Sequence, residues 1–200
     1  MRLVKLNEIA SSVILELGKI NSNEKNKLIN LDLIEISDYF DFSDKNIALS
    51  SELSNKEIEE FAEHCEKTDR ETCLIVFNKN FNSNLFDSVD CKNILLVGLE
   101  NLESREILFL AENKVRQMNL NSFLTNIEDS TEIIMEFASG KELLLAFDLN
   151  ILDFDLGGLT SRQAIYILGR MSMMKNLRIA LLSGFKEKEK IGARLLAELF

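Results

Sequence analysis

The sequence predicts an α/β protein of three layers, in which helices cover both faces of a mostly parallel sheet. Short, nearly continuous apolar runs such as Cys73-Leu74-Ile75-Val76-Phe77 are typical of strands that are buried on both faces. Segments whose apolar residues have helical spacing alternate with these runs. Alternating strands and helices imply a parallel sheet with right-handed crossovers. The length of 200 residues suggests a single domain over residues 1–200, and a hydrophobic content of 46% can fill its core.

Residues 1–45 carry the weakest pattern, and we expect them to be a divergent or truncated N-terminal part of the domain. Within them, Glu8–Gly18 fits a helix or a strand, and Leu31–Ile36 is a candidate for an additional strand. Beyond them, the apolar runs predict strands at five places: Asn46–Ser50, Thr72–Asn78, Asn93–Gly98, Glu142–Asn150 and Leu177–Ser183.

The segments between these strands have the periodicity of amphipathic helices. In Lys56–Glu66, the residues Ile58, Phe61 and Cys65 fall on one stripe. The same reasoning predicts helices at Ser104–Glu112, Ser130–Ser139 and Ser161–Met174. Before the last of these, Thr160 is expected to cap the helix N-terminus, with Gln163 in the capping-box position. The final segment, Ile191–Phe200, predicts an amphipathic helix that is too apolar to be stable in water alone.

The charge balance argues against nucleic-acid and membrane partners. The chain has 23 Lys and Arg against 33 Asp and Glu, a net charge of −10, and such a surface repels phosphate and anionic lipid. The opening residues lack a secretory apolar core, and no apolar run approaches the roughly 18 residues of a membrane span. The three cysteines, Cys65, Cys73 and Cys91, have no CxxC spacing and fit buried reduced thiols. We therefore expect a cytoplasmic protein.

Function in an open parallel sheet usually lies just beyond the carboxyl ends of the strands. Here those ends are polar, rich in Asn, devoid of His and poor in carboxylates: Ser50-Ser51-Glu52-Leu53-Ser54, Asn78-Lys79-Asn80-Phe81-Asn82, Gly98-Leu99-Glu100, Asp148-Leu149-Asn150 and Ser183-Gly184-Phe185. No glycine-rich phosphate loop, serine elbow or HExxH motif is present. Because His64 is the single histidine, chemistry that needs two or three imidazoles is excluded.

The segment from Phe147 to Asp153, followed by Gly157–Ala164, resembles the ureohydrolase family of arginase, agmatinase and their relatives. In that family a strand ends in Ser-Phe-Asp-x-Asp-x-Leu-Asp-Pro, and a Gly-Gly-Leu-Thr-x-Arg-Glu-Ala turn then opens a helix. Upstream, Lys92–Leu99 followed by Glu106 is similar to the family's Asn-Val-x-x-x-Gly-x-Arg strand and its acidic helix. The resemblance runs from Asn46 to the C-terminus and implies an arginase-like fold.

The resemblance also implies a binuclear manganese site, but the residues at its ligand positions depart from the family pattern. The family motifs Gly-Gly-Asp-His-Ser, Asp-Ala-His-x-Asp and Asp-x-Asp supply the ligands. The positions that correspond to these ligands keep one carboxylate in this chain: Leu53, Asn78, Asn80, Asn82, Asp148 and Asn150. Ser183 stands where the family has a Glu that engages the guanidinium of the substrate. Both the metal site and the substrate contact are therefore expected to be degenerate.

Two divalent ions need hard, mostly anionic oxygen and imidazole ligands, which neutral Asn carbonyls do not replace. With Asp148 as the one remaining carboxylate, we expect no metal, no cofactor and no metal-bound hydroxide to act as a nucleophile. The sequence thus predicts a catalytically inactive ureohydrolase-like protein that acts as a structural or regulatory interaction subunit. Its apolar C-terminal helix predicts a homo-oligomer, or a heteromer with an active relative.

Other interpretations stay open at this point. The chain could be an enzyme or a small-molecule-binding protein whose cleft is rebuilt at the strand ends from Glu52, Asn78, Asn80, Asn82, Glu100, Asp148 and Asn150. The Asn-rich strand end could also be a loop without any relation to the family. For Asp148, a cap on nearby backbone N–H groups is an alternative to a relic metal ligand.

Overall fold

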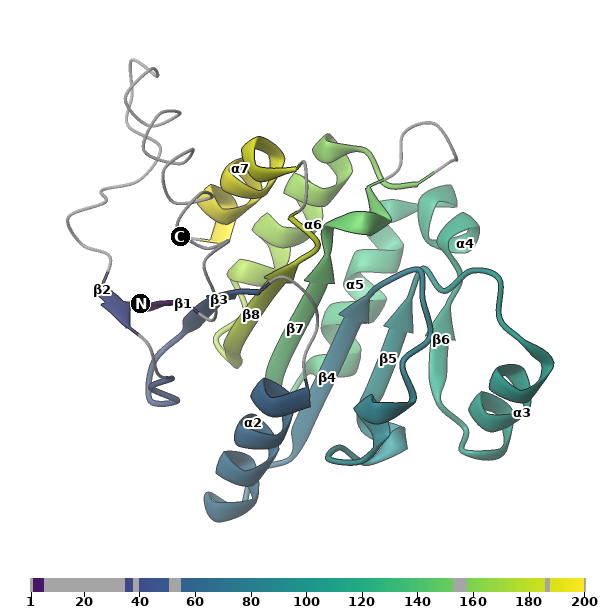
Figure 1. Cartoon of the computed structure of the whole chain (residues 1–200), viewed down its shortest axis with the longest axis horizontal. Coiled ribbons are helices and arrows are strands. Elements are labelled where there is room, and N and C mark those ends of the chain that lie inside the picture. Colours follow the sequence, from purple (N-terminus) through teal and green to yellow (C-terminus); the bar gives the residue numbers. More distant parts are fainter. Residues whose placement is uncertain are drawn as a thin grey trace.

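A computed structural model of the chain describes residues 2–5, 35–37, 40–50, 55–152, 158–185 and 188–199. In this part of the chain, eight strands form one sheet in the order β2-β1-β3-β8-β7-β4-β5-β6, and every neighbouring pair is parallel (Figure 1). The strands are β1 (Arg2–Lys5), β2 (Glu35–Ser37), β3 (Asn46–Leu49), β4 (Thr72–Phe77), β5 (Ile94–Val97), β6 (Arg116–Met118), β7 (Glu142–Asp148) and β8 (Leu177–Ser183).

Helices cover both faces of this sheet. One face carries α2 (Asn55–Lys67) and α3 (Ser104–Glu112), and the other carries α4 (Leu120–Thr125), α5 (Ile127–Ala138), α6 (Ser161–Ser172) and α7 (Glu189–Leu199) (Figure 1). Short 3₁₀ turns are η2 (Ser83–Phe86), η3 (Cys91–Asn93) and η4 (Leu149–Ile151). Among the helices that the structure describes, none has the length and apolar character to cross a bilayer.

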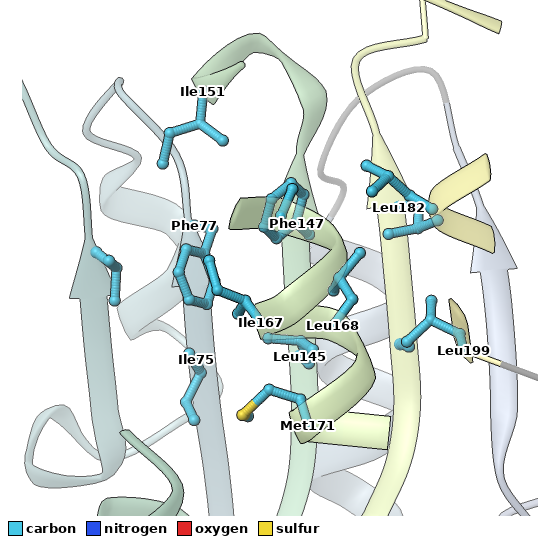
Figure 2. Packing of buried hydrophobic residues seen from close by; sticks show 14 of the residues in the cluster. Ile75, Phe77, Leu145, Phe147, Ile151, Ile167, Leu168, Met171, Leu182 and Leu199 are labelled. Carbon is cyan, nitrogen blue, oxygen red and sulfur yellow. The ribbon is translucent and has the colours of Figure 1, made fainter. Parts of the chain in front are cut away.

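The core has two halves because successive residues of a strand point to opposite faces of the sheet. In β4, Ile75 and Phe77 face α4–α7, whereas Leu74 and Val76 face α2 and α3. Figure 2 shows the first half, where Phe77 lies beside Phe147 of β7 and close to Ile167 of α6. Their ring centroids are 5.2 Å apart. Burial on both faces explains why these strands have nearly continuous apolar sequences.

The predicted three-layer parallel fold is confirmed, and its departures have local causes. The strand expected over Glu142–Asn150 ends at Asp148, whose carboxylate accepts a hydrogen bond from the backbone N–H of Asn150 and so starts η4. The helix expected from Ser130 begins at Ile127, because Asn126 caps it by accepting from the N–H of Asp129. Strand β6 and helix α4 were not predicted, since β6 is a short and largely exposed edge strand.

Several predicted features fall partly or wholly outside the described residues. Glu8–Gly18 lies outside them, and of Leu31–Ile36 only the last two residues are described, where they belong to β2.

The helix predicted over Ser161–Met174 ends at Ser172. Its predicted capping box is confirmed: the Thr160 hydroxyl accepts from the N–H of Gln163, and the Gln163 side chain accepts from the N–H of Thr160.

The apolar face of the C-terminal helix is covered by this chain itself. In α7, the side chains of Ala193, Leu195, Leu196 and Leu199 are fully buried against this chain's own core. The Lys45 ammonium also donates to the carbonyl of Leu199 at 2.8 Å, which ties the end of α7 to the start of β3. Self-association stays a prediction, but the burial of α7 gives it no support.

The strand order places a topological switch between β4 and β7. From β4 the chain moves toward β5 and β6, whereas from β7 it moves in the opposite direction to β8. In open α/β sheets the crevice at the carboxyl ends of such a pair is the usual ligand site. The residues that follow β4 and β7 are therefore the first place to look for a functional site.

Candidate functional site

The predicted strand ends meet at one edge of the sheet. Asp148 at the end of β7 is in register with Ser183 at the end of β8, and Phe147 is in register with Phe77, the residue before Asn78. Since all three strands run parallel, Asn78, Asp148 and Ser183 lie at neighbouring carboxyl ends, as predicted. We call this region, from the end of β4 to the end of β8, the carboxyl edge.

Asp148 is a turn-capping residue. Its Oδ1 accepts a hydrogen bond of 2.8 Å from the backbone N–H of Asn150, which begins η4 directly after β7. Burial raises the pKa of the half-buried Asp148 carboxyl above its ordinary value, opposed by the N–H of Asn150 and the charge of Lys188. The backbone-capping interpretation of Asp148 is confirmed by this geometry.

Gly184 lets the backbone after β8 approach this carboxylate closely. Its φ is +73°, a conformation that glycine adopts without the steric cost of a Cβ. A Cβ at this position would lie 2.2 Å from Oδ1 of Asp148 and 3.2 Å from the backbone nitrogen of Leu149. The space beside the Asp148 carboxylate is therefore filled by the chain's own backbone.

Lys188 brings a positive charge to the same place. Its ammonium donates to the carbonyl oxygen of Leu149 at 2.9 Å and lies 3.4 Å from Oδ1 of Asn150. Both acceptors belong to η4, the turn that Asp148 starts. A cation of the chain itself is thus hydrogen-bonded at the residues that follow the remaining carboxylate.

The asparagines after β4 are engaged in local turns. Oδ1 of Asn78 accepts from the N–H of Asn80 at 3.0 Å, and Oδ1 of Asn82 accepts from the N–H of Asn84 at 3.1 Å. Asn82 caps η2 and lines a cavity of about 540 Å³ that also contacts Phe81, Arg105 and Phe109. The side-chain oxygens of Asn78 and Asn82 therefore already accept hydrogen bonds from the backbone.

An apolar residue lies next to the switch point. Ile151, at the end of η4, is fully buried and lies close to Gly98 after β5, where an added Cβ would be 2.5 Å from Cδ1 of Ile151. Figure 2 shows Ile151 above Phe77 at the carboxyl end of β4. An aliphatic side chain is thus buried beside the carboxyl ends of β4 and β5, next to the switch point.

A pair of manganese ions, implied by the resemblance, does not fit the residues present. Within the described part of the chain, no group of three or more His, Cys, Asp or Glu side chains is arranged to hold a metal ion. Asp148 supplies one carboxylate, and the neighbouring Asn78 offers a neutral oxygen that already accepts a hydrogen bond. The charge of two divalent ions needs several anionic ligands. We therefore derive no chemistry through a metal at this edge.

The other predicted site residues have varied positions. Ser183 is 1% exposed and offers no charge to a substrate. Glu100 lies near Lys79, with 3.7 Å between its Oε2 and the lysine ammonium nitrogen. Asn80 and Asn150 are exposed. Glu52 and Leu53 lie outside the described residues.

Sequence reasoning missed two charged groups. Lys188 comes from a run of alternating Lys and Glu in which nothing distinguishes it from its neighbours. Glu142 is 5% exposed at the start of β7, and Arg70 and Arg178 both bind its carboxylate. A glutamate at the head of an apolar strand was the available signal for Glu142, but its two partners are far away in sequence.

Comparison with solved structures identifies the fold. Arginase from Helicobacter pylori matches with a TM-score of 0.71 and 13% identity, over 100% of this chain and 98% of that one. Arginase from Bacillus subtilis matches with a TM-score of 0.72 and 10% identity, over 100% and 97% of the two chains. Formimidoylglutamase from Bacillus subtilis matches with a TM-score of 0.70 and 10% identity, over 99% and 84%. No protein-family model and no curated protein matches the sequence.

These matches define the class of the fold as the α/β fold of the ureohydrolases. More particularly, it is the fold of arginase and formimidoylglutamase, and the likeness spans the whole chain. The arginase-like fold implied by the sequence motifs is confirmed.

Proposed function

We propose that this chain is a catalytically inactive protein of the arginase fold, which acts through its surfaces as a structural or regulatory subunit. The observation that carries the proposal is the set of side chains at the carboxyl edge that could bind a metal ion. Asp148 is bound to a backbone N–H, Asn78 is bound likewise, and Lys188 supplies a cation where a metal site needs anions.

The chain lacks a visible source of the nucleophile among its described strand-end residues. Hydrolysis of a guanidinium or amidine group at neutral pH requires an activated water, and two metal ions supply it by lowering the pKa of a bridging water. At this edge the described residues offer no cluster of ligands for such ions. Asp148 is the one acid among the described strand-end residues that correspond to ligands, and a second acid or base to replace the metal is missing from that set.

An assay of urea release tests the proposal. With manganese present, we expect the purified chain to release no urea from arginine or agmatine above the buffer rate, because no hydroxide nucleophile forms. An active arginase serves as the positive control. The Asp148→Asn variant is the matched negative control, since Asn keeps the acceptor oxygen that caps η4. Manganese-dependent turnover that this variant abolishes would contradict the proposal.

The rebuilt cleft has less support as a function. A cleft made from Glu52, Asn78, Asn80, Asn82, Asp148 and Asn150 needs side chains that are free to meet a ligand. The oxygens of Asn78, Asn82 and Asp148 that are described above are instead used by the backbone of their own turns. The buried Ile151 also places an apolar side chain beside the carboxyl ends of β4 and β5, next to the switch point.

Assembly is the second part of the proposal, as a homo-oligomer or as a heteromer with an active relative. The surface that favours it is the outer side of α3, where Ile107 and Leu108 are 53% and 57% exposed beside the edge strand β6. Apolar side chains and an unpaired strand edge are common features of association surfaces. Light scattering of the intact chain should give more than the monomer mass, and a strict monomer at high micromolar concentration would refute self-assembly.

The cysteines favour the cytoplasm as the working compartment. Cys65 and Cys73 are buried free thiols, and Cys91 is a half-buried one. Burial raises the pKa of Cys73 to about 12, so this thiol is neutral and inert at neutral pH. Buried reduced thiols of this kind suit a reducing environment.

A further inference from the structure

Lys188 occupies an electrostatically unfavourable place at the N-terminus of α7. It directly precedes α7, and its carbonyl accepts from the N–H of Gly192 in the first turn. A positive charge at a helix N-terminus is opposed by the helix dipole. The ammonium nevertheless has two acceptors outside α7, the carbonyl of Leu149 and the side-chain oxygen of Asn150. Contacts with η4, rather than with α7, therefore account for the position of the Lys188 ammonium.

Close packing fixes the segment that carries Lys188. The N–H of Lys188 donates to the carbonyl of Phe185 at 2.7 Å. At Gly192, an added Cβ would lie 2.4 Å from the ring of Phe185 and 3.3 Å from the side chain of Leu149. The start of α7 thus lies directly on the residues after β8 and β7. The packing of this first turn against Phe185 and Leu149 places Lys188 beside η4.

We propose that the Lys188 ammonium is the resident cation of the carboxyl edge, a tethered charge that balances Asp148 in place of a bound metal ion. The carboxylate of Asp148 is half-buried, starts η4, and has the Gly184 backbone against one oxygen. The ammonium is bonded to that same turn. Among the described ligand positions of this edge, a metal ion would meet a single carboxylate and the nearby positive charge of the ammonium.

This inference rests on the proposed loss of the metal site, but its consequence is a coupling between two side chains. Removing the ammonium should leave the negative charge of Asp148 less well compensated and so lower the stability of the fold. Removing both charges should restore part of that stability. The coupling also means that the cation joins α7 to the end of β7.

A double-mutant cycle measures this coupling in buffer with EDTA, so that metal has no part in the result. We expect Lys188→Met to raise the equilibrium constant for unfolding about tenfold in the natural chain, but only about threefold in the Asp148→Asn background. Asn at position 148 keeps the acceptor oxygen for the N–H of Asn150, so the difference reports the charge. Lys190→Met, at an exposed position of the same helix, is the matched control and should change little.

Equal effects of Lys188→Met in the two backgrounds would overturn the resident-cation proposal. If Lys188→Met does not fold, Lys188→Gln serves in its place, because glutamine removes the charge and keeps a hydrogen-bond donor. Manganese bound in stoichiometric amount to the natural chain would instead refute the proposed loss of the metal site. The two failures are therefore distinguished by different measurements.

Discussion

Leu195→Asp should unfold the protein rather than separate its subunits. Leu195 is fully buried between α7 and the core, so an aspartate there would be an unpaired charge in an apolar environment. We expect a loss of about 4 kcal/mol in the free energy of unfolding. Urea denaturation followed by circular dichroism measures it.

The matched control is Leu108→Asp on α3. Leu108 is 57% exposed, so the same substitution should change stability by less than about 1 kcal/mol. If the outer side of α3 is an association surface, this variant should instead lower the mass measured by light scattering. A Leu195→Asp chain that keeps its stability but loses mass would show that α7, not the core, is the interface.

Glu142→Gln should have the second largest effect. The carboxylate of Glu142 is almost fully buried and is bound by both Arg70 and Arg178, so the amide would remove the anion that the two guanidinium groups share. Breaking a buried ion pair from one side typically costs about 3 kcal/mol of stability. Glu60→Gln is the control, because its partner Lys56 is exposed and 3.8 Å away, and such pairs contribute about 0.5 kcal/mol or less. Equal losses in both variants would contradict this account of Glu142.

The same carboxylate gives a pH dependence with a defined sign. Burial alone would raise the pKa of Glu142, but hydrogen bonds from Arg178 and Arg70 outweigh burial and hold it below the ordinary value of 4.5. A lowered pKa in the folded state stabilises the protein above pH 4.5, and this stabilisation is lost as the pH falls below that value. The stability difference between the natural chain and Glu142→Gln should therefore shrink from pH 7 toward acid.

Local patterns were sufficient to predict most of the fold. Strand β8 and helix α3 have the predicted bounds, because an uninterrupted apolar run and a helical stripe of apolar residues are properties of the segment itself. Strand β6 could not be predicted, since it joins the sheet through its backbone pairing with β5 and not through an apolar sequence. The C-terminal helix was predicted, but whether its own chain covers it is a long-range property.

The carboxyl edge was predictable in part for the same reason. Asn78, Asp148 and Ser183 each follow a recognisable strand, so parallel pairing alone brings their strand ends together. The Lys188 ammonium reaches η4 from 39 positions away in sequence, and the contact depends on how α7 packs. Spacing within a segment carries no information on such a contact.

Metal content tests the central claim most directly. The chain is incubated with excess manganese, separated from free ion and analysed for bound metal. Because the described residues of the carboxyl edge offer a single carboxylate at the ligand positions, with a lysine close by, we expect no stoichiometric manganese. A reproducible content of about two ions per chain, as in binuclear metal sites, would contradict the account.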